Sequence, residues 1–136
     1  MVDPNALFHV AIKVDDVPQA VEFYRTHLNG DVVSRRRADE ANPSDPRRVE
    51  YAALDVADKL VYVVERPPYE AADLVDELPA GFLHFGYVVD DLEAAAASLR
   101  ADGVEFLMEP TEYGDHSIAF FHAPGGVRIE LLEPRE

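Results

Sequence analysis

The sequence contains the same phrase twice, and this repeat limits the possible folds more than any other feature. HVAIKVDD begins at His9 and HFGYVVDD begins at His84, so each copy runs from a histidine through an apolar stretch to two aspartates. Each half of a repeat protein exposes apolar surface that it cannot bury alone, so paired halves support one another. The repeat therefore predicts two similar halves that fold together.

Each copy of the phrase opens a run of predicted elements in the same order, which is a strand, a helix and three further strands. Residues 7–14 alternate as a strand does, and Asp16 is a typical N-terminal cap for the helix that follows. That helix is expected to end at Asn29, before a glycine, and Asp91 caps the corresponding second helix. The other predicted strands are residues 31–36, 49–54, 59–65, 84–89, 104–108, 117–122 and 127–132. The pattern predicts two tandem βαβββ modules.

These modules are expected to form a single domain over residues 1–136. A chain of 136 residues that is 48% hydrophobic is long enough to close one core. Module one is predicted at about residues 5–68 and module two at about 82–134. The segment between them, YEAADLVDELPAG at about 69–81, is predicted to be a linker helix.

Charge and composition exclude several classes of partner. The net charge of −15 repels a phosphate backbone and an anionic membrane surface, so no nucleic acid or membrane partner is expected. The chain has no cysteine, no apolar run of membrane-spanning length and no signal-peptide pattern near Met1. A cytoplasmic protein that binds a small-molecule substrate is the resulting expectation. Since the sequence has no phosphate-cradling glycine loop, no nucleotide cofactor is expected.

The repeated histidines and one carboxylate are candidate metal ligands. A single strand histidine is more often a hydrogen-bonded structural residue, but His9 and His84 occupy equivalent places in related halves. Glu130 lies within an apolar strand, where an unpaired charge is costly to bury. Arg128 could neutralise it, or a cation shared with both histidines could do so. Two histidines and one carboxylate suit a divalent Fe, Mn, Co, Ni or Zn ion and leave positions for substrate oxygens.

The paired modules, the two histidine-to-aspartate openings and the closing FFHAPGGVRIELLEP resemble the vicinal oxygen chelate superfamily over almost the whole chain. This superfamily includes glyoxalase I, methylmalonyl-CoA epimerase, extradiol dioxygenases and bleomycin-resistance proteins. The resemblance implies an α+β fold whose modules form a cupped, barrel-like mixed sheet with helices outside, and it implies a homodimer. Carried onto this chain, the family's ligand positions are His9, Tyr62, His84 and Glu130.

Two positions depart from the patterns that the resemblance implies. Glyoxalase and epimerase members usually have Glu or Gln where this chain has Tyr62, and a neutral phenol is a poor ligand. Tyr62 is expected either to orient a water or substrate oxygen or to pack. The dioxygenase pattern is matched by Gly114, His116, Pro124, Gly126 and Glu130, but Phe120 stands where a tyrosine is expected. His116 is either an acid or base near the site or an exposed loop residue.

These residues predict a metal-dependent enzyme that binds neighbouring oxygens of a small substrate. A lyase or isomerase of the glyoxalase or epimerase kind is the leading interpretation, with Glu130 as ligand and proton acceptor. One alternative is an extradiol-type ring-cleaving dioxygenase. Another is a metal-free protein that binds a drug or other small molecule, as resistance proteins do, without needing His9, His84 and Glu130 together.

Overall fold

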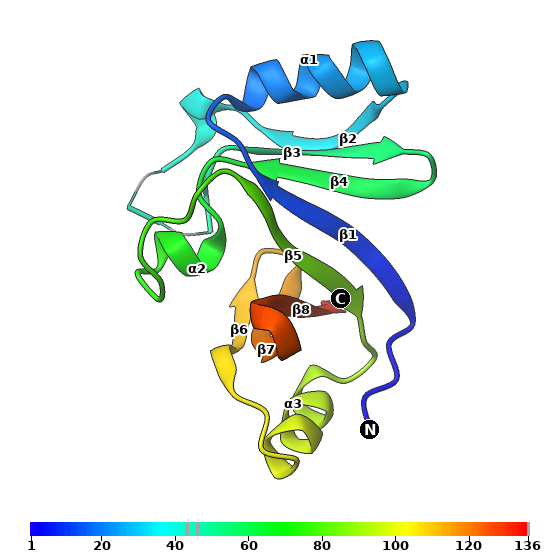
Figure 1. Cartoon of the computed structure of the whole chain (residues 1–136), viewed down its shortest axis with the longest axis vertical. Coiled ribbons are helices and arrows are strands. Elements are labelled where there is room, and N and C mark those ends of the chain that lie inside the picture. Colours follow the sequence, from blue (N-terminus) through cyan, green and yellow to red (C-terminus); the bar gives the residue numbers. More distant parts are fainter. Residues whose placement is uncertain (43, 46, 136) are drawn as a thin grey trace. The chain divides into compact units, whose positions relative to one another are not determined.

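The computed structural model describes residues 1–42, 44–45 and 47–135 (Figure 1). It divides into two compact units. The first unit is His9–Leu83, and the second unit combines Met1–Phe8 with His84–Glu136. Among the described residues no helix is long and apolar enough to cross a membrane.

The first unit carries four strands and two helices. Its strands lie in the order β2-β3-β4-β1, with β1 parallel to β4 and the other neighbours antiparallel. The elements are β1 (Ala6–Lys13), α1 (Val17–Leu28), β2 (Asp31–Arg36), β3 (Tyr51–Val56), β4 (Lys59–Val64) and α2 (Pro68–Ala71), with a short 3₁₀ turn at Ala38–Glu40. These are the β-α-β-β-β elements predicted for module one.

One face of this sheet is covered by α1, as Figure 1 shows. The helix begins because the Asp16 carboxylate accepts a hydrogen bond from the Gln19 backbone at 3.0 Å, and it ends where Asn29 turns left-handed at φ 54°. Its buried side chains Val17 and Val21 pack on alternate strand residues. Those strand residues are Ala52, Leu54 and Val63, with Ile12 and Val61 partly buried beside them. Alternation along the strands leaves His9 and Tyr62 on the opposite face.

The second unit repeats the arrangement with four strands in the order β5-β8-β7-β6. Strands β5 and β8 are parallel, and β7 is antiparallel to both of its neighbours. The elements are β5 (Gly81–Val88), α3 (Leu92–Ala101), β6 (Phe106–Tyr113), β7 (His116–Ala123) and β8 (Val127–Pro134), with a 3₁₀ turn at Pro124–Gly126. Helix α3 buries Leu92 and Ala95 against Ala119 and Leu131. The predicted α+β class with two βαβββ modules is confirmed.

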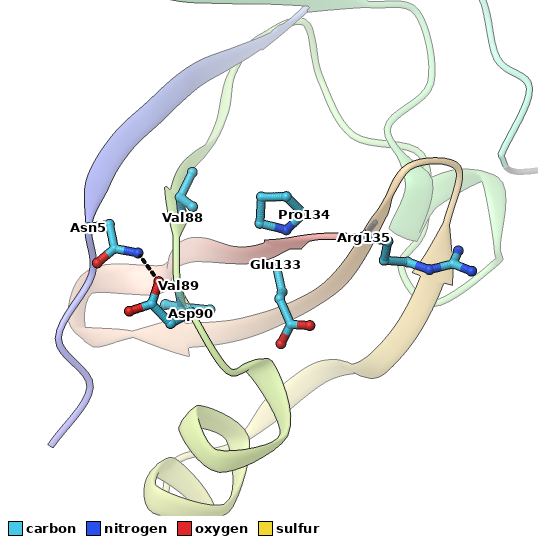
Figure 2. A pocket seen from close by; sticks show the side chains of 7 residues that line it. All are labelled: Asn5, Val88, Val89, Asp90, Glu133, Pro134 and Arg135. Atoms are coloured by element: carbon cyan, nitrogen blue, oxygen red, sulfur yellow. Dashed lines mark hydrogen bonds between the residues drawn. The ribbon is translucent and has the colours of Figure 1, made fainter.

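The first eight residues belong to the second unit. The Asn5 backbone donates to the Val88 carbonyl at 2.8 Å, and its side chain donates to the Asp90 carboxylate at 2.7 Å (Figure 2). The amino group of Met1 donates to the Ser98 hydroxyl. Strand β1 therefore starts in one unit and continues as the strand that carries His9 in the other.

The linker is where the predicted secondary structure was wrong. Helix α2 has only four residues, Pro68–Ala71, in place of a helix over about 69–81. Asp73 adopts a left-handed conformation at φ 59°, which ends the helical turn. The Glu70 carboxylate also accepts a hydrogen bond from the Leu78 backbone at 2.7 Å, and this bond holds the segment as a loop.

Strand boundaries moved by smaller amounts. Strand β3 begins at Tyr51, two residues later than predicted, and β6 runs to Tyr113, beyond the expected end at residue 108. The register of β6 shifts twice against β7, once on each side of Met108. Such irregularities weaken the alternation from which strand ends are read.

Candidate functional site

His84 and Glu130 face one another in the second unit. Parallel pairing of β5 with β8 sets Gly86 opposite Glu130 and His84 opposite Arg128, so His84 and Glu130 are diagonal neighbours on one face. His84 Nε2 lies 3.7 Å from Glu130 Oε1. The two residues are only 2% and 5% exposed. A buried imidazole and a buried carboxylate therefore lie next to one another inside this unit.

Phe120 covers the same pair from β7. Its strand position is directly opposite Glu130, and its ring meets the His84 ring edge-on, with centroids 4.9 Å apart at 77°. Phe120 is fully buried. An apolar ring beside two polar groups keeps water away from them and strengthens their electrostatic interaction with any charge placed nearby.

The geometry of this pair suits a metal ion. At 3.7 Å the two atoms are farther apart than a hydrogen bond normally allows. Two ligands that each lie about 2.1 Å from one cation are separated by about 3 to 3.6 Å, and the observed 3.7 Å is close to the upper end of that range. Imidazole nitrogen and carboxylate oxygen are also ligand types that divalent transition metals accept. His84 and Glu130 could therefore hold the same cation.

His9 lies in a different environment in the first unit. Parallel pairing of β1 with β4 sets Ala11 opposite Tyr62, and the His9 and Tyr62 rings lie 5.5 Å apart. Tyr62 in turn stacks on Tyr51, with centroids 5.0 Å apart and planes at 15°. His9 is 6% exposed. Tyr62, whose phenol stands at a position that the family resemblance assigns to a metal ligand, is therefore a direct neighbour of His9.

The two registers establish which positions correspond. Ala11 is two residues beyond His9 and pairs with Tyr62, while Gly86 is two residues beyond His84 and pairs with Glu130. Tyr62 is therefore the counterpart of Glu130, in agreement with the ligand positions that the family resemblance implies.

His116 lies at the start of β7, where it pairs with Tyr113 and Pro134. Its ring lies 6.0 Å from the Phe8 ring. The alternative interpretation as an exposed loop residue was wrong, because His116 is a partly buried strand residue. It lies four residues before Phe120 on the same strand face, a separation of about 13 Å. His116 is therefore well away from the His84–Glu130 pair along the strand.

A buried ion pair was missed by the sequence analysis. Lys13 Nζ donates to Glu70 Oε1 at 2.5 Å and to the Leu78 carbonyl at 2.6 Å, and both charged residues are 7% exposed. The only sequence signal was the alternation of β1, which puts Lys13 on the same face as His9 and Ala11. Nothing local to Glu70 identified it as the partner, 57 residues away.

An open pocket in the second unit lies at the ends of β5 and β8 (Figure 2). It is lined by Asn5, Val88, Val89, Asp90, Glu133, Pro134 and Arg135. Its acidic groups are engaged locally, since Glu133 accepts a hydrogen bond from the Leu92 backbone at 2.7 Å and Asp90 accepts one from Asn5. These bonds fix the start of α3 and the N-terminal segment.

Comparison with known proteins gives lyases and epimerases among the relatives. A plant protein, the probable chloroplastic lactoylglutathione lyase of Arabidopsis thaliana, is 29% identical over 96% of this chain, which spans 36% of that protein's length. The 2-epi-5-epi-valiolone epimerase of an Actinomyces species is 32% identical over 93% of this chain and 78% of its own. The crystal structure of methylmalonyl-CoA epimerase from Mycobacterium tuberculosis is similar with a TM-score of 0.74 and 29% identity, covering 98% of this chain and 90% of that one.

These three relatives are a lyase and two epimerases, and the fold similarity to the solved structure extends over nearly all of the chain. The sequence model of one family matches residues 6–131, which include both histidines, Tyr62 and Glu130. The chain belongs to the Glyoxalase/Bleomycin resistance protein/Dioxygenase superfamily.

Proposed function

We propose that this protein is a metal-dependent lyase or isomerase of the glyoxalase or epimerase kind, acting on a small substrate with neighbouring oxygen atoms. The observation that carries the proposal is the buried His84–Glu130 pair, whose facing atoms lie 3.7 Å apart, close to the spacing of two ligands of one cation. The lyase and epimerase relatives support this reaction class.

His9 is proposed as the third ligand. It is the repeat equivalent of His84, and both imidazoles are buried, as is Glu130. This equivalence in the repeat is the reason for adding His9 to the ligand set. Two imidazoles and a carboxylate suit Fe, Mn, Co, Ni or Zn.

Each remaining residue has a proposed task. A bound divalent cation would supply a Lewis acid for neighbouring substrate oxygens. Glu130 would accept a proton at its carboxylate, and Tyr62 would donate a hydrogen bond from its phenol to a water or substrate oxygen, or pack beside His9. His116 is proposed as a proton-transfer group for a substrate that extends along β7 towards it.

Phe120 favours the lyase or isomerase over a ring-cleaving dioxygenase. The side chain beside His84 and opposite Glu130 is a phenyl ring, so that position has no hydroxyl group to offer a substrate. The hydroxyl expected of the dioxygenase pattern at that place is therefore missing.

Metal analysis is the decisive experiment. Protein purified without chelator should contain close to one equivalent of a divalent transition metal, and His84→Ala should lose it. His122→Ala is the matched control, because His122 is an exposed histidine on β7 in the same unit. Equal metal content in all three proteins would overturn the proposal.

The metal-loaded protein should then be assayed with methylmalonyl-CoA, with the hemithioacetal of methylglyoxal and glutathione, and with catechol. Isomerisation of either of the first two without oxygen uptake is expected. Oxygen uptake with catechol would instead indicate a ring-cleaving dioxygenase. Tight binding of a small molecule by the metal-free His84→Ala protein, without turnover by the native one, would replace it with a binding protein.

A homodimer is also proposed, because the family resemblance implies one. Light scattering of the purified chain should give twice the mass of 15.1 kDa. A monomer at every concentration tested would contradict it.

A further inference from the structure

Positive charge is concentrated in one short part of an acidic chain. The whole protein has 12 lysines and arginines against 27 acidic residues. Five of its arginines lie between residues 35 and 48: Arg35, Arg36, Arg37, Arg47 and Arg48. A cationic group on an otherwise acidic protein raises the local concentration of anions around it. The question is which of these arginines faces a possible ligand.

Arg36 is the arginine whose position fits this role. It pairs directly with Tyr51 across β2 and β3, so it lies on the face of the sheet that α1 does not cover. Arg47 is paired with Asp45 at 3.1 Å, and Arg48 donates to the Glu40 carbonyl at 3.2 Å. The guanidinium of Arg36 instead lies over the Tyr51 ring, 5.3 Å from its centroid.

The guanidinium is held in place but keeps donors for a ligand. Arg36 Nη1 donates to the Val49 carbonyl at 3.2 Å, and the ring beneath it fixes the plane by a cation–π interaction. A guanidinium has five N–H donors in a rigid fork that matches a carboxylate or a phosphate. The backbone bond uses one of them. Half-buried and pre-oriented, Arg36 would lose little conformational entropy when an anion binds.

A row of aromatic rings connects Arg36 with His9. Tyr51 stacks on Tyr62 at 5.0 Å, and Tyr62 lies 5.5 Å from His9. The Tyr51 phenol shares a short hydrogen bond with the Ser34 hydroxyl, which fixes its ring. Tyr51 and Tyr62 are each partly exposed, so the row offers aromatic surface between Arg36 and His9.

We propose that Arg36 binds an acidic group of the substrate, and that Tyr51 and Tyr62 contact the substrate's apolar body between that group and His9. This inference rests on the proposed function only for the reacting end of the substrate. Three ring-to-ring or ring-to-cation steps of about 5 Å separate Arg36 from His9. The substrate class is therefore an elongated anion, whose acidic group is remote from its reacting oxygens.

The test uses small probes of matched shape. Benzoate, phenyl phosphate and neutral benzamide are titrated into the full chain, labelled with ¹⁵N, and binding is followed at the arginine Nε–H resonances. We expect the two anions to bind at least about tenfold more tightly than benzamide, because only they form charge-assisted bonds with the guanidinium. The tighter of the two anions identifies the acidic group as a carboxylate or a phosphate. Equal binding of benzamide and both anions would overturn the proposal.

Two arginine variants make the test specific. Arg36→Gln should weaken anion binding about tenfold, whereas Arg25→Gln should leave it unchanged. Arg25 is a matched control because it is exposed on α1, which covers the other face of the same sheet. Arg36→Lys, which retains the charge without the fork, should fall between native protein and Arg36→Gln. Equal losses in Arg36→Gln and Arg25→Gln would show nonspecific attraction and overturn the proposal.

The aromatic row and the metal are tested separately. Tyr62→Leu should weaken benzoate binding but not acetate binding, because acetate has no ring to contact Tyr62; unchanged benzoate binding would remove Tyr62 from the subsite. The titrations are repeated in His84→Ala. Since Arg36 and His84 belong to different units, anion binding should survive in that variant even where metal content is lost. Failure of the metal site and failure of the anion subsite thus give different results.

Discussion

In the first unit the residue paired with Ala11 is Tyr62, whereas in the second unit the residue paired with Gly86 is Glu130. The backbone at the helix starts that follow β1 and β5 is nearly the same in the two units. Asp16 has φ −142° and ψ 100°, Asp91 has φ −141° and ψ 97°, and each accepts one backbone hydrogen bond at 3.0 Å. The β1–α1 and β5–α3 connections thus start their helices with the same kind of aspartate N-cap.

The difference lies in the side chains that the shared frame presents. The second unit offers a buried carboxylate to its histidine, and the first offers a phenol. Strand β1 ends in the buried, paired Lys13, while its repeat equivalent on β5 is Val88. A duplicated backbone therefore does not require duplicated chemistry, and the two units are expected to respond unequally to equivalent substitutions.

The largest difference should appear at the ends of the first strands. Lys13→Met is expected to lower the free energy of unfolding by about 3 kcal/mol, because it leaves the Glu70 carboxylate buried without its cation. Val88→Met, at the equivalent position, changes no charge and should lower the free energy of unfolding by less. Urea denaturation followed by circular dichroism measures both.

Adding Glu70→Gln to Lys13→Met should restore most of the lost stability. The amide still accepts from the Leu78 backbone and leaves no buried charge. If the double variant is no more stable than the single one, the loss comes from packing instead of from the unpaired charge.

Metal affinity should separate Tyr62 from Glu130. Glu130→Gln is expected to weaken metal binding by at least about 100-fold, since even groups that only support a ligand contribute about 10- to 100-fold. Tyr62→Phe should weaken it by less than about threefold, because a neutral phenol is a poor ligand. Competition with a chromogenic chelator gives both constants. A Tyr62→Phe loss as large as that of Glu130→Gln would make the units chemically equivalent.

The helix caps allow a smaller test of the shared frame. Asp16→Ala should lower the free energy of unfolding by about 1 kcal/mol. Asp91→Ala should lower it by about half as much, because Glu133 also accepts a hydrogen bond at the start of α3 and Glu93 lies in its first turn. Equal losses would indicate that Glu133 adds nothing to the cap; Asp91→Ala/Glu133→Gln would then behave like Asp91→Ala alone.

The smallest effect should come from Glu50, next to β3 in the first unit. Partial burial, helped by the negative charge of Glu65, raises the pKa of Glu50 above its ordinary value of 4.5. The folded protein therefore holds this proton more tightly than the unfolded chain, and stability falls as the pH rises through the raised pKa.

Glu50→Gln should remove that fall, so the variant should be slightly more stable than the native protein at pH 7. Urea midpoints between pH 4 and 7 measure the two slopes. Parallel slopes would show that Glu50 has the same pKa in the folded and unfolded chains.

Much of the fold was predictable because its signals are local. Asp16, Asn29 and Asp91 mark helix ends by their own chemistry, and the structure confirms all three. Glu130 was identified as a site residue because a carboxylate in an apolar strand needs an explanation. Its proximity to His84 follows from the parallel pairing that a repeated βαβββ unit implies.

What could not be predicted depends on contacts between distant residues. The linker was expected to be helical because its composition is helix-forming, but Glu70 fixes Leu78 and Lys13 by side-chain bonds that no periodicity reveals. The role proposed for Arg36 was also hidden, because a run of three arginines resembles an ordinary solvated segment. Its pairing with Tyr51 and its bond to the Val49 carbonyl distinguish it from its neighbours.

The burial of Lys13 has a practical consequence for chemical labelling. The chain has two lysines, and Lys59 is exposed whereas Lys13 is 7% exposed and bound to Glu70. An amine-reactive dye should therefore modify Lys59 and the N-terminal amine of the native protein and reach Lys13 only when β1 separates from the linker. Mass spectrometry of the labelled peptides would then measure how fast β1 separates from the linker, at a single residue and without an engineered cysteine.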